Sequence, residues 1–179
     1  MTDITNLSTV NVAISNLIAV VTMNNPPVNA QNRQFHNDLT LAFDVLSDRN
    51  DVRSIVLTGA GKCFSAGADI KGRASQESDL GDHWVHSRRV RECFYSIMEC
   101  RKPVIAAING AALGAGLAVA ASADILIASE SASVGLPEIN VGLLGGGRHA
   151  MRLFSHSKTR RLMLTGQRLS GAELYRLGV

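Results

Sequence analysis

Two short turns built from small residues are the parts of this 179-residue chain best suited to hold a ligand by its backbone. They are CFSAGADIK (63–71) and NGAALGAG (109–116), and each comes just after an apolar, β-rich segment. Small side chains let a ligand approach backbone amides, and amides at the start of a helix have no partner within it. Two such amides aimed at one point would stabilise an oxyanion. Whether the two turns converge depends on the tertiary structure.

Glu138 is the carboxylate whose setting best suits proton transfer. It follows Pro137 and lies between the apolar residues Leu136 and Ile139. Such a setting permits partial burial, which raises the pKa of a carboxyl group as acid–base catalysis requires. A structural role is the alternative, because a Glu after Pro often begins a helix and its charge then meets the helix dipole.

The segments that must position these residues alternate between strands and helices. Strands are predicted for a hairpin over 10–23 that turns at Ser15-Asn16, and for 54–58, 104–108 and 124–128. Helices are predicted for 32–47, 85–100 and 112–123, and for a capping box that begins at Ser170 and includes Glu173. The polar segment 71–82 is predicted to be a loop. This alternation predicts an α/β fold with a partly parallel sheet, in one domain over 1–179.

Composition excludes several classes of protein. With 46% hydrophobic and 18% charged residues, the chain is neither disordered nor fibrous, and it has no apolar run near the ~20 residues of a membrane span. A net charge of +3 does not favour nucleic-acid binding, and eight scattered aromatic residues provide no platform on which bases could stack. Cys63, Cys93 and Cys100 lack disulfide or metal-ligand spacing. Together with the absence of a signal-like N-terminus, this predicts a cytoplasmic protein with no metal site.

Several motifs in one order resemble the crotonase, or enoyl-CoA hydratase/isomerase, superfamily. They are CFSAGADIK, KPVIAAINGAALGAG (102–116), the Ala-Asp-Ile at 123–125 and GLPEINVGLL (135–144). The likeness starts near Val12, includes NPPVNA (25–30) and reaches Val179. It implies the crotonase-like (ClpP/crotonase) fold of repeated ββα units, which holds an acyl-CoA thioester.

The resemblance also implies roles for residues at matching motif positions. The amides of Ala68 and Ala115 would bind the thioester oxygen, and Glu138 would be the catalytic acid or base. The residues expected to contact coenzyme A and substrate are Ala66, Asp69, Ile70, Lys71 and Gly114. Coenzyme A is part of the substrate in this family, so the resemblance implies no separate cofactor.

Two positions depart from the family pattern. Hydratases carry a second Glu where this chain has Ala118, and an alanine cannot orient water or carry a proton. The segment Gly145-Gly146-Gly147-Arg148-His149 stands where relatives commonly have Pro-Gly-x-Gly-Gly. His149 could supply a second acid–base group, since the unperturbed pKa of histidine is ~6.5, or it could be a polar residue at a helix start. Arg148 could meet a phosphate, and His83 and His86 are expected to be exposed.

Several reactions therefore stay open. A single carboxylate can move a proton between two carbons, which favours an enoyl-CoA isomerase, whereas the commonest activity of the family is hydration. A hydrolase or decarboxylase on the same oxyanion site is a further alternative. So is a catalytically impaired homologue that binds coenzyme A or RNA, as Ala118 and the net positive charge would allow. A serine nucleophile at Ser65 is least favoured, because no histidine stands at the family position of its partner.

The length of the sequence leads to an expectation about its C-terminal region. Relatives continue beyond the position of Val179 into a helical region that closes the acyl-CoA site and builds trimers, often paired into hexamers. The sequence ends directly after a capped helix. We therefore expect a core that lacks the C-terminal helical region and is truncated there, and a homotrimer or hexamer where that region is present.

Overall fold

The computed structural model describes residues 4–70 and 80–179, and within them the strands form two main sheets and one short pair. The five-stranded sheet has the order β1-β2-β4-β7-β9, and the four-stranded sheet has the order β11-β10-β8-β5. The first consists of β1 (Val10–Ser15), β2 (Ile18–Met23), β4 (Ser54–Gly59), β7 (Val104–Ile108) and β9 (Ile125–Ala128). The second consists of β5 (Cys63–Ser65), β8 (Ala111–Leu113), β10 (Ser133–Gly135) and β11 (Arg168–Ser170). The short pair is β3 (Ala30–Gln31) with β6 (Gly67–Ala68).

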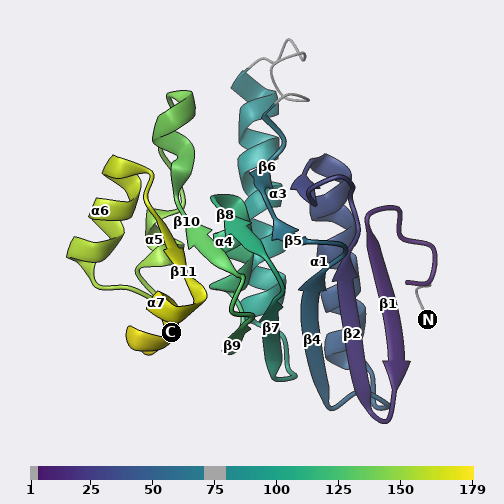
Figure 1. Cartoon of the computed structure of the whole chain (residues 1–179). Helices are drawn as coiled ribbons and strands as arrows, with labels where there is room; N and C mark the ends of the chain where they lie inside the picture. Colours follow the sequence, from purple (N-terminus) through teal and green to yellow (C-terminus); the bar gives the residue numbers. More distant parts are fainter. Residues whose placement is uncertain (1–3, 71–79) are drawn as a thin grey trace.

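The chain repeats one unit as it crosses the molecule. Strands β4, β7 and β9 of the larger sheet are each followed by a strand of the smaller sheet, namely β5, β8 and β10. Strands β2, β4, β7 and β9 run parallel, and only the β1–β2 hairpin is antiparallel in that sheet. Figure 1 shows this progression from the N-terminal hairpin on the right to the C-terminal helices on the left. The predicted α/β fold of repeated ββα units is confirmed.

The helices cover these sheets. Helix α1 (Arg33–Asp48) buries Phe35, Leu39, Phe43 and Leu46, and it packs against α3 (Leu80–Met98). The other helices are α4 (Ala115–Ala120), the 3-10 helix η1 (Pro137–Val141), α5 (Gly147–Ala150), α6 (His156–Thr165) and α7 (Gly171–Arg176). None of the helices in the described ranges is long and apolar enough to cross a membrane.

Two of the sequence predictions are wrong in their boundaries. The segment 112–123 was expected to be one helix, but Ala112 and Leu113 belong to strand β8 and the helix covers only Ala115–Ala120. Strand β8 lies between β5 and β10, so contacts from distant parts of the chain override the helical propensity of alanine. Helix α3 also begins at Leu80, inside the segment predicted to be a loop.

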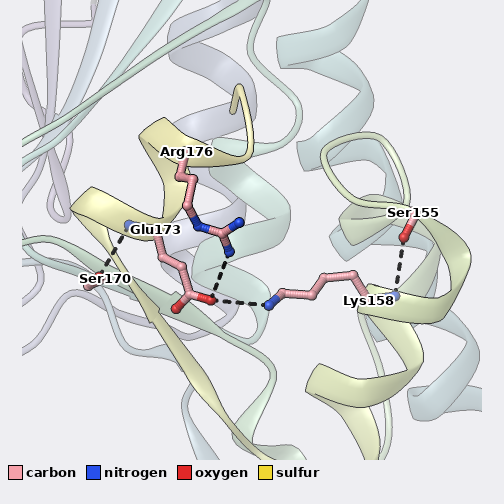
Figure 2. A network of polar contacts seen from close by, with 5 residues as sticks. All are labelled: Ser155, Lys158, Ser170, Glu173 and Arg176. Atoms are coloured by element: carbon pink, nitrogen blue, oxygen red, sulfur yellow. Dashed lines mark hydrogen bonds and ion pairs between the residues drawn. The ribbon is translucent and has the colours of Figure 1, made fainter.

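The C-terminal capping box is half confirmed. Ser170 Oγ accepts a hydrogen bond from the Glu173 amide at 3.3 Å, as the capping pattern predicts. The Glu173 carboxylate, expected to reach back to the helix start, contacts Lys158 at 3.3 Å and Arg176 at 3.7 Å instead (Figure 2). Ser155 caps α6 in the same way, by accepting from the Lys158 amide at 3.3 Å. Glu173 thereby connects α6 with α7.

Candidate active site

The two small-residue turns lie in direct contact. A β-carbon added at Gly67 would lie 2.6 Å from the carbonyl oxygen of Leu113 and 3.3 Å from the amide nitrogen of Ala115. Gly67 also has a φ of +96°, which side chains other than glycine rarely adopt. Gly67 therefore approaches Ala115 closely, and Ala68 is the next residue after Gly67. The structure thus brings together the two turns that carry the predicted oxyanion amides.

Parallel pairing in the smaller sheet produces this approach. Cys63 and Ser65 of β5 pair with Ala111 and Ala112 of β8, so both turns leave the sheet side by side. A β-carbon at Gly116 would lie only 2.2 Å from the Ser65 carbonyl oxygen, which shows how closely α4 packs on the first turn. The small residues are thus needed for contact between the turns themselves.

Two asparagines hold the chain over residues 59–63, which leads from β4 into the first turn. Asn109, directly after β7, donates from Nδ2 to the carbonyl oxygens of Gly59 at 2.9 Å and Gly61 at 3.0 Å. Asn29 donates from Nδ2 to the carbonyl oxygens of Ala60 at 3.0 Å and Cys63 at 2.8 Å. Neither asparagine was predicted from the sequence to have a role. The signal for Asn109 was a polar residue immediately after a buried strand.

The predicted oxyanion residues occupy the ends of short elements. Ala68 is exposed at the end of β6 and pairs in register with Gln31 of β3. Ala115 is half-buried and begins α4, after Gly114, whose φ is +56°. Amides in the first turn of a helix have no partner within that helix. Ala68 and Ala115 thus stand at the two edges of the contact between Gly67 and the second turn.

The residues predicted to contact coenzyme A lie around the same turns. Ala66 is exposed, Asp69 is half-buried and Ile70 is 45% exposed. Gly114 is buried, and its amide donates to the Gly135 carbonyl oxygen at 2.9 Å. Lys71 lies outside the described residues.

Glu138 lies directly against the second turn. A β-carbon at Gly114 would be 2.6 Å from Oε1 of Glu138 and 3.3 Å from its carboxyl carbon. The other oxygen, Oε2, is buried, and among the described residues it has no hydrogen-bond partner. Burial raises the pKa of the Glu138 carboxyl, and its own backbone amide offsets part of that effect. A carboxyl whose pKa is raised by burial therefore lies beside Gly114, the residue before Ala115.

The position of the second family Glu is inert. Ala118 is 2% exposed and belongs to the hydrophobic core, with its amide bonded to the Gly114 carbonyl oxygen at 3.1 Å. Ser65, the alternative nucleophile, is fully buried. Its Oγ donates to the Asn29 carbonyl oxygen at 2.7 Å and accepts from the Gly67 amide at 3.3 Å. These contacts give Ser65 a structural role in the first turn.

The histidines singled out by sequence have three different environments. His83 is exposed, as expected, whereas His86 is half-buried with its ring 6.0 Å from that of His36. His36 was not noticed in the sequence; it is 2% exposed, and burial, together with His86, lowers its pKa to about 4. His149 is half-buried against Phe94, with 4.7 Å between ring centroids, and Arg148 is exposed.

Comparison with known proteins identifies the family of the chain. The family model described as enoyl-CoA hydratase/isomerase matches residues 13–179. A probable enoyl-CoA hydratase of Bacillus subtilis is 37% identical over 97% of this chain and 68% of its own length. A (7aS)-7a-methyl-1,5-dioxo-2,3,5,6,7,7a-hexahydro-1H-indene-carboxyl-CoA hydrolase of Mycobacterium tuberculosis is 36% identical over 90% of this chain and 65% of its own length.

A solved structure extends the comparison to the fold. The enoyl-CoA hydratase from Thermoplasma volcanium superposes with a TM-score of 0.87 at 33% identity, covering 95% of this chain and 69% of that one. The chain thus spans about two thirds of the length of the proteins that it matches. From the family match over 13–179 and the shared fold, we conclude that the chain belongs to the enoyl-CoA hydratase/isomerase family.

Proposed function

We propose that this protein acts on acyl-CoA thioesters by forming an enolate, with Glu138 as the acid–base group and the Ala68 and Ala115 amides as the oxyanion site. The observation that carries the proposal is the contact of the Glu138 carboxyl with Gly114, next to Ala115 and to the Gly67 turn. An oxyanion donor and a proton-transfer group are the two things that enolate chemistry requires.

The steps follow from this arrangement. The thioester oxygen accepts hydrogen bonds from the two amides, which become stronger as negative charge develops on that oxygen. The Glu138 carboxylate removes a proton from the carbon next to the thioester or from a carbon conjugated with it. The resulting acid returns the proton to the same or another carbon. Loss of one such oxyanion donor costs ~2.7–4 kcal/mol of transition-state stabilisation in other enzymes, so the two amides would supply much of the rate enhancement.

Coenzyme A would bind along the first turn. We assign this contact to Ala66, Asp69, Ile70 and Lys71, and a further contact with coenzyme A or substrate to Gly114 of the second turn. The small residues among them leave backbone groups open to a ligand. The acyl group would then extend from the thioester toward Glu138.

The test is exchange of the proton next to the thioester with deuterium from solvent, measured with a panel of saturated and unsaturated acyl-CoA compounds. Glu138→Gln should reduce exchange by at least ~100-fold, because an amide cannot accept the proton. Glu99→Gln is the matched control, since Glu99 is an exposed carboxylate directly after α3 and belongs to neither turn. Unchanged exchange in the Glu138 variant would remove the assignment.

Product analysis separates the reaction types within this proposal. A lone carboxylate beside a buried Ala118 favours an isomerase, which would give only a shifted double bond. The 36% identity to a carboxyl-CoA hydrolase supports hydrolysis as a second candidate. A hydrolase that cleaves the thioester would consume one water and release a carboxylic acid and free coenzyme A, whereas an isomer keeps both the thioester and the mass of the substrate.

A further inference from the structure

We propose that Ser65 is a positioning residue of the oxyanion site, and that its hydroxyl and carbonyl groups set the Ala68 and Ala115 amides relative to each other. This inference rests on the proposed function, because it concerns the amides that would bind the thioester oxygen. Ser65 is fully buried, so it acts through the two turns that carry these amides.

The first argument is that the Ser65 hydroxyl makes all its hydrogen bonds with the chain around Ala68. It donates to the Asn29 carbonyl oxygen at 2.7 Å, and it accepts from Gln31 Nε2 at 3.2 Å and from the Gly67 amide at 3.3 Å. A hydroxyl offers one donor and two acceptor positions, so all three are occupied. Gly67 comes directly before Ala68, and Gln31 lies opposite Ala68 in the β3–β6 pair. One hydroxyl therefore connects both segments that frame Ala68.

The second argument concerns the direction of the Ala68 amide. The next amide along the chain, that of Asp69, donates to the Gln31 carbonyl oxygen at 3.1 Å and so points toward β3. Successive backbone amides of an extended strand point to opposite edges, so the Ala68 amide points away from β3. Gly67, with a φ of +96° and no side chain, places little restriction of its own on the peptide that carries this amide. By holding the Gly67 amide, the Ser65 hydroxyl supplies that restriction.

The third argument is that Ser65 also meets the second turn. A β-carbon at Gly116 would lie 2.2 Å from the Ser65 carbonyl oxygen and 3.0 Å from the Ser65 β-carbon. Gly116 directly follows Ala115, and Ser65 pairs with Ala112 in the smaller sheet. Ser65 thus contacts the chain neighbour of each oxyanion residue, Gly67 in the first turn and Gly116 in the second. Its position therefore sets the spacing of the two amides.

The spacing matters because two donors must reach one oxygen. An oxyanion donor is effective at roughly 2.7–3.1 Å from the place that the charged oxygen occupies. The negative charge on that oxygen is larger in the transition state than in the bound substrate. A loss of alignment should therefore lower the rate constant more than the affinity for the acyl-CoA.

The experiment measures how strongly the site polarises a bound thioester carbonyl. The probe is butanoyl-CoA labelled with carbon-13 at the carbonyl carbon, and infrared difference spectra record the carbonyl stretching frequency of the bound probe. Hydrogen bonds from the two amides should lower this frequency relative to that of the free thioester. The frequency is a property of each bound molecule, so a smaller folded fraction in a variant does not change it.

Ser65→Ala removes the hydroxyl from between the two segments. The frequency shift on binding should shrink by about half, because one of the two donors loses its alignment. The rate of α-proton exchange at saturating acyl-CoA should fall by about 10–100-fold, while the half-saturating concentration stays within about threefold. Ser122→Ala is the matched control, because Ser122 is 4% exposed and belongs to neither turn. Its hydroxyl donates to the Ala118 carbonyl oxygen at 2.8 Å, so this variant also loses a buried hydrogen bond.

Gln31→Leu is a second variant that separates positioning from stability. It keeps a side chain of similar size and removes one of the three hydrogen bonds of the Ser65 hydroxyl. It also removes Gln31 Oε1, which is buried and has no hydrogen-bond partner among the described residues. Urea unfolding should therefore show little change in stability. The frequency shift and the exchange rate should change in the same direction as in Ser65→Ala, by smaller factors.

The outcomes separate this proposal from the one before it. An unchanged frequency shift in Ser65→Ala, or in Gln31→Leu if Ser65→Ala does not fold, overturns the role of Ser65. Equal effects of Ser65→Ala and Ser122→Ala also overturn it, since Ser65 would then only support the fold. No shift in the unaltered protein overturns the oxyanion site of the proposed function and this inference with it. Glu138→Gln should keep the full shift and lose exchange, and exchange that survives in that variant overturns the proposed role of Glu138 alone.

Discussion

The Glu138 carboxyl lies so close to Gly114 that any side chain at position 114 would displace it. A β-carbon there would be 2.6 Å from Glu138 Oε1, well inside van der Waals contact. The contact joins η1 to the second turn, two elements separated by β9 and β10 in the sequence. The Glu138 carboxyl can therefore occupy this position only because residue 114, on another element, is a glycine without a β-carbon.

The first prediction concerns Gly114→Ala. The methyl group would push the carboxyl away, and a displacement of about 1 Å at a reacting group can cost about 100-fold in rate. Steady-state turnover should fall by that order, with a smaller loss of stability from the φ of +56°. Gly178→Ala is the control, because Gly178 has a φ of +76° but open space around it. Equal activities of the two variants would contradict the prediction.

The second prediction concerns Asn109, which holds the segment leading into the first turn through the Gly59 and Gly61 carbonyl oxygens. Asn109→Ala leaves these acceptors unpaired, so urea unfolding should show a loss of about 1–3 kcal/mol. Turnover should fall by a larger factor than the fraction of folded protein, since the first turn, which follows this segment, carries Ala68. The exposed Asn50→Ala should change neither quantity. An Asn109 variant with normal stability would show that the turn holds its shape without these bonds.

The third prediction is a loss of stability in acid that originates at His36. The unfolded chain takes up a proton at His36 near pH 6.5, whereas the folded protein does so only near pH 4. The unfolded state thus binds more protons in between, and stability falls as pH drops from about 6.5 to about 4. The total loss is on the order of 3 kcal/mol.

His36→Leu tests the origin of this effect. The variant should lose less stability than the unaltered protein between pH 7 and pH 4.5 in urea titrations, because no proton binds at position 36 in either state. The exposed His156→Gln should keep the original acid profile. Identical profiles for the His36 variant and the unaltered protein would place the acid sensitivity elsewhere.

The fourth prediction contrasts two ion pairs by double-mutant cycles. Lys158 and Glu173 have side chains that are 19% and 32% exposed, whereas Arg101 and Asp48 are 76% and 77% exposed. Solvent screens the second pair more strongly. We expect a coupling energy of about 0.5–1 kcal/mol for the first pair and about zero for the second. Equal couplings would mean that Glu173 does not join α6 to α7.

Long elements were predictable because their periodicity is local. The predicted hairpin over 10–23 is present, but its turn is Asn16-Leu17, both at positive φ, one residue later than the predicted Ser15-Asn16. The strand predicted over 104–108 has these bounds in the structure. Helix α1 was placed within one residue at each end. The strands of the smaller sheet were not predicted from the sequence. Each of β5, β8, β10 and β11 has only three residues, and they pair with segments distant in the sequence.

The sequence by itself determined the α/β class, the family and the residue types of the candidate site: two small-residue turns, Glu138 and an alanine at position 118. Motifs and hydrophobic periodicity are properties of neighbouring residues, so they can be read from the chain alone. Only the tertiary structure decided that Gly67 meets Ala115, that Glu138 rests on Gly114 and that His149 packs on Phe94. Each of these contacts joins separate elements, and its geometry depends on packing between strands and helices that no local pattern encodes.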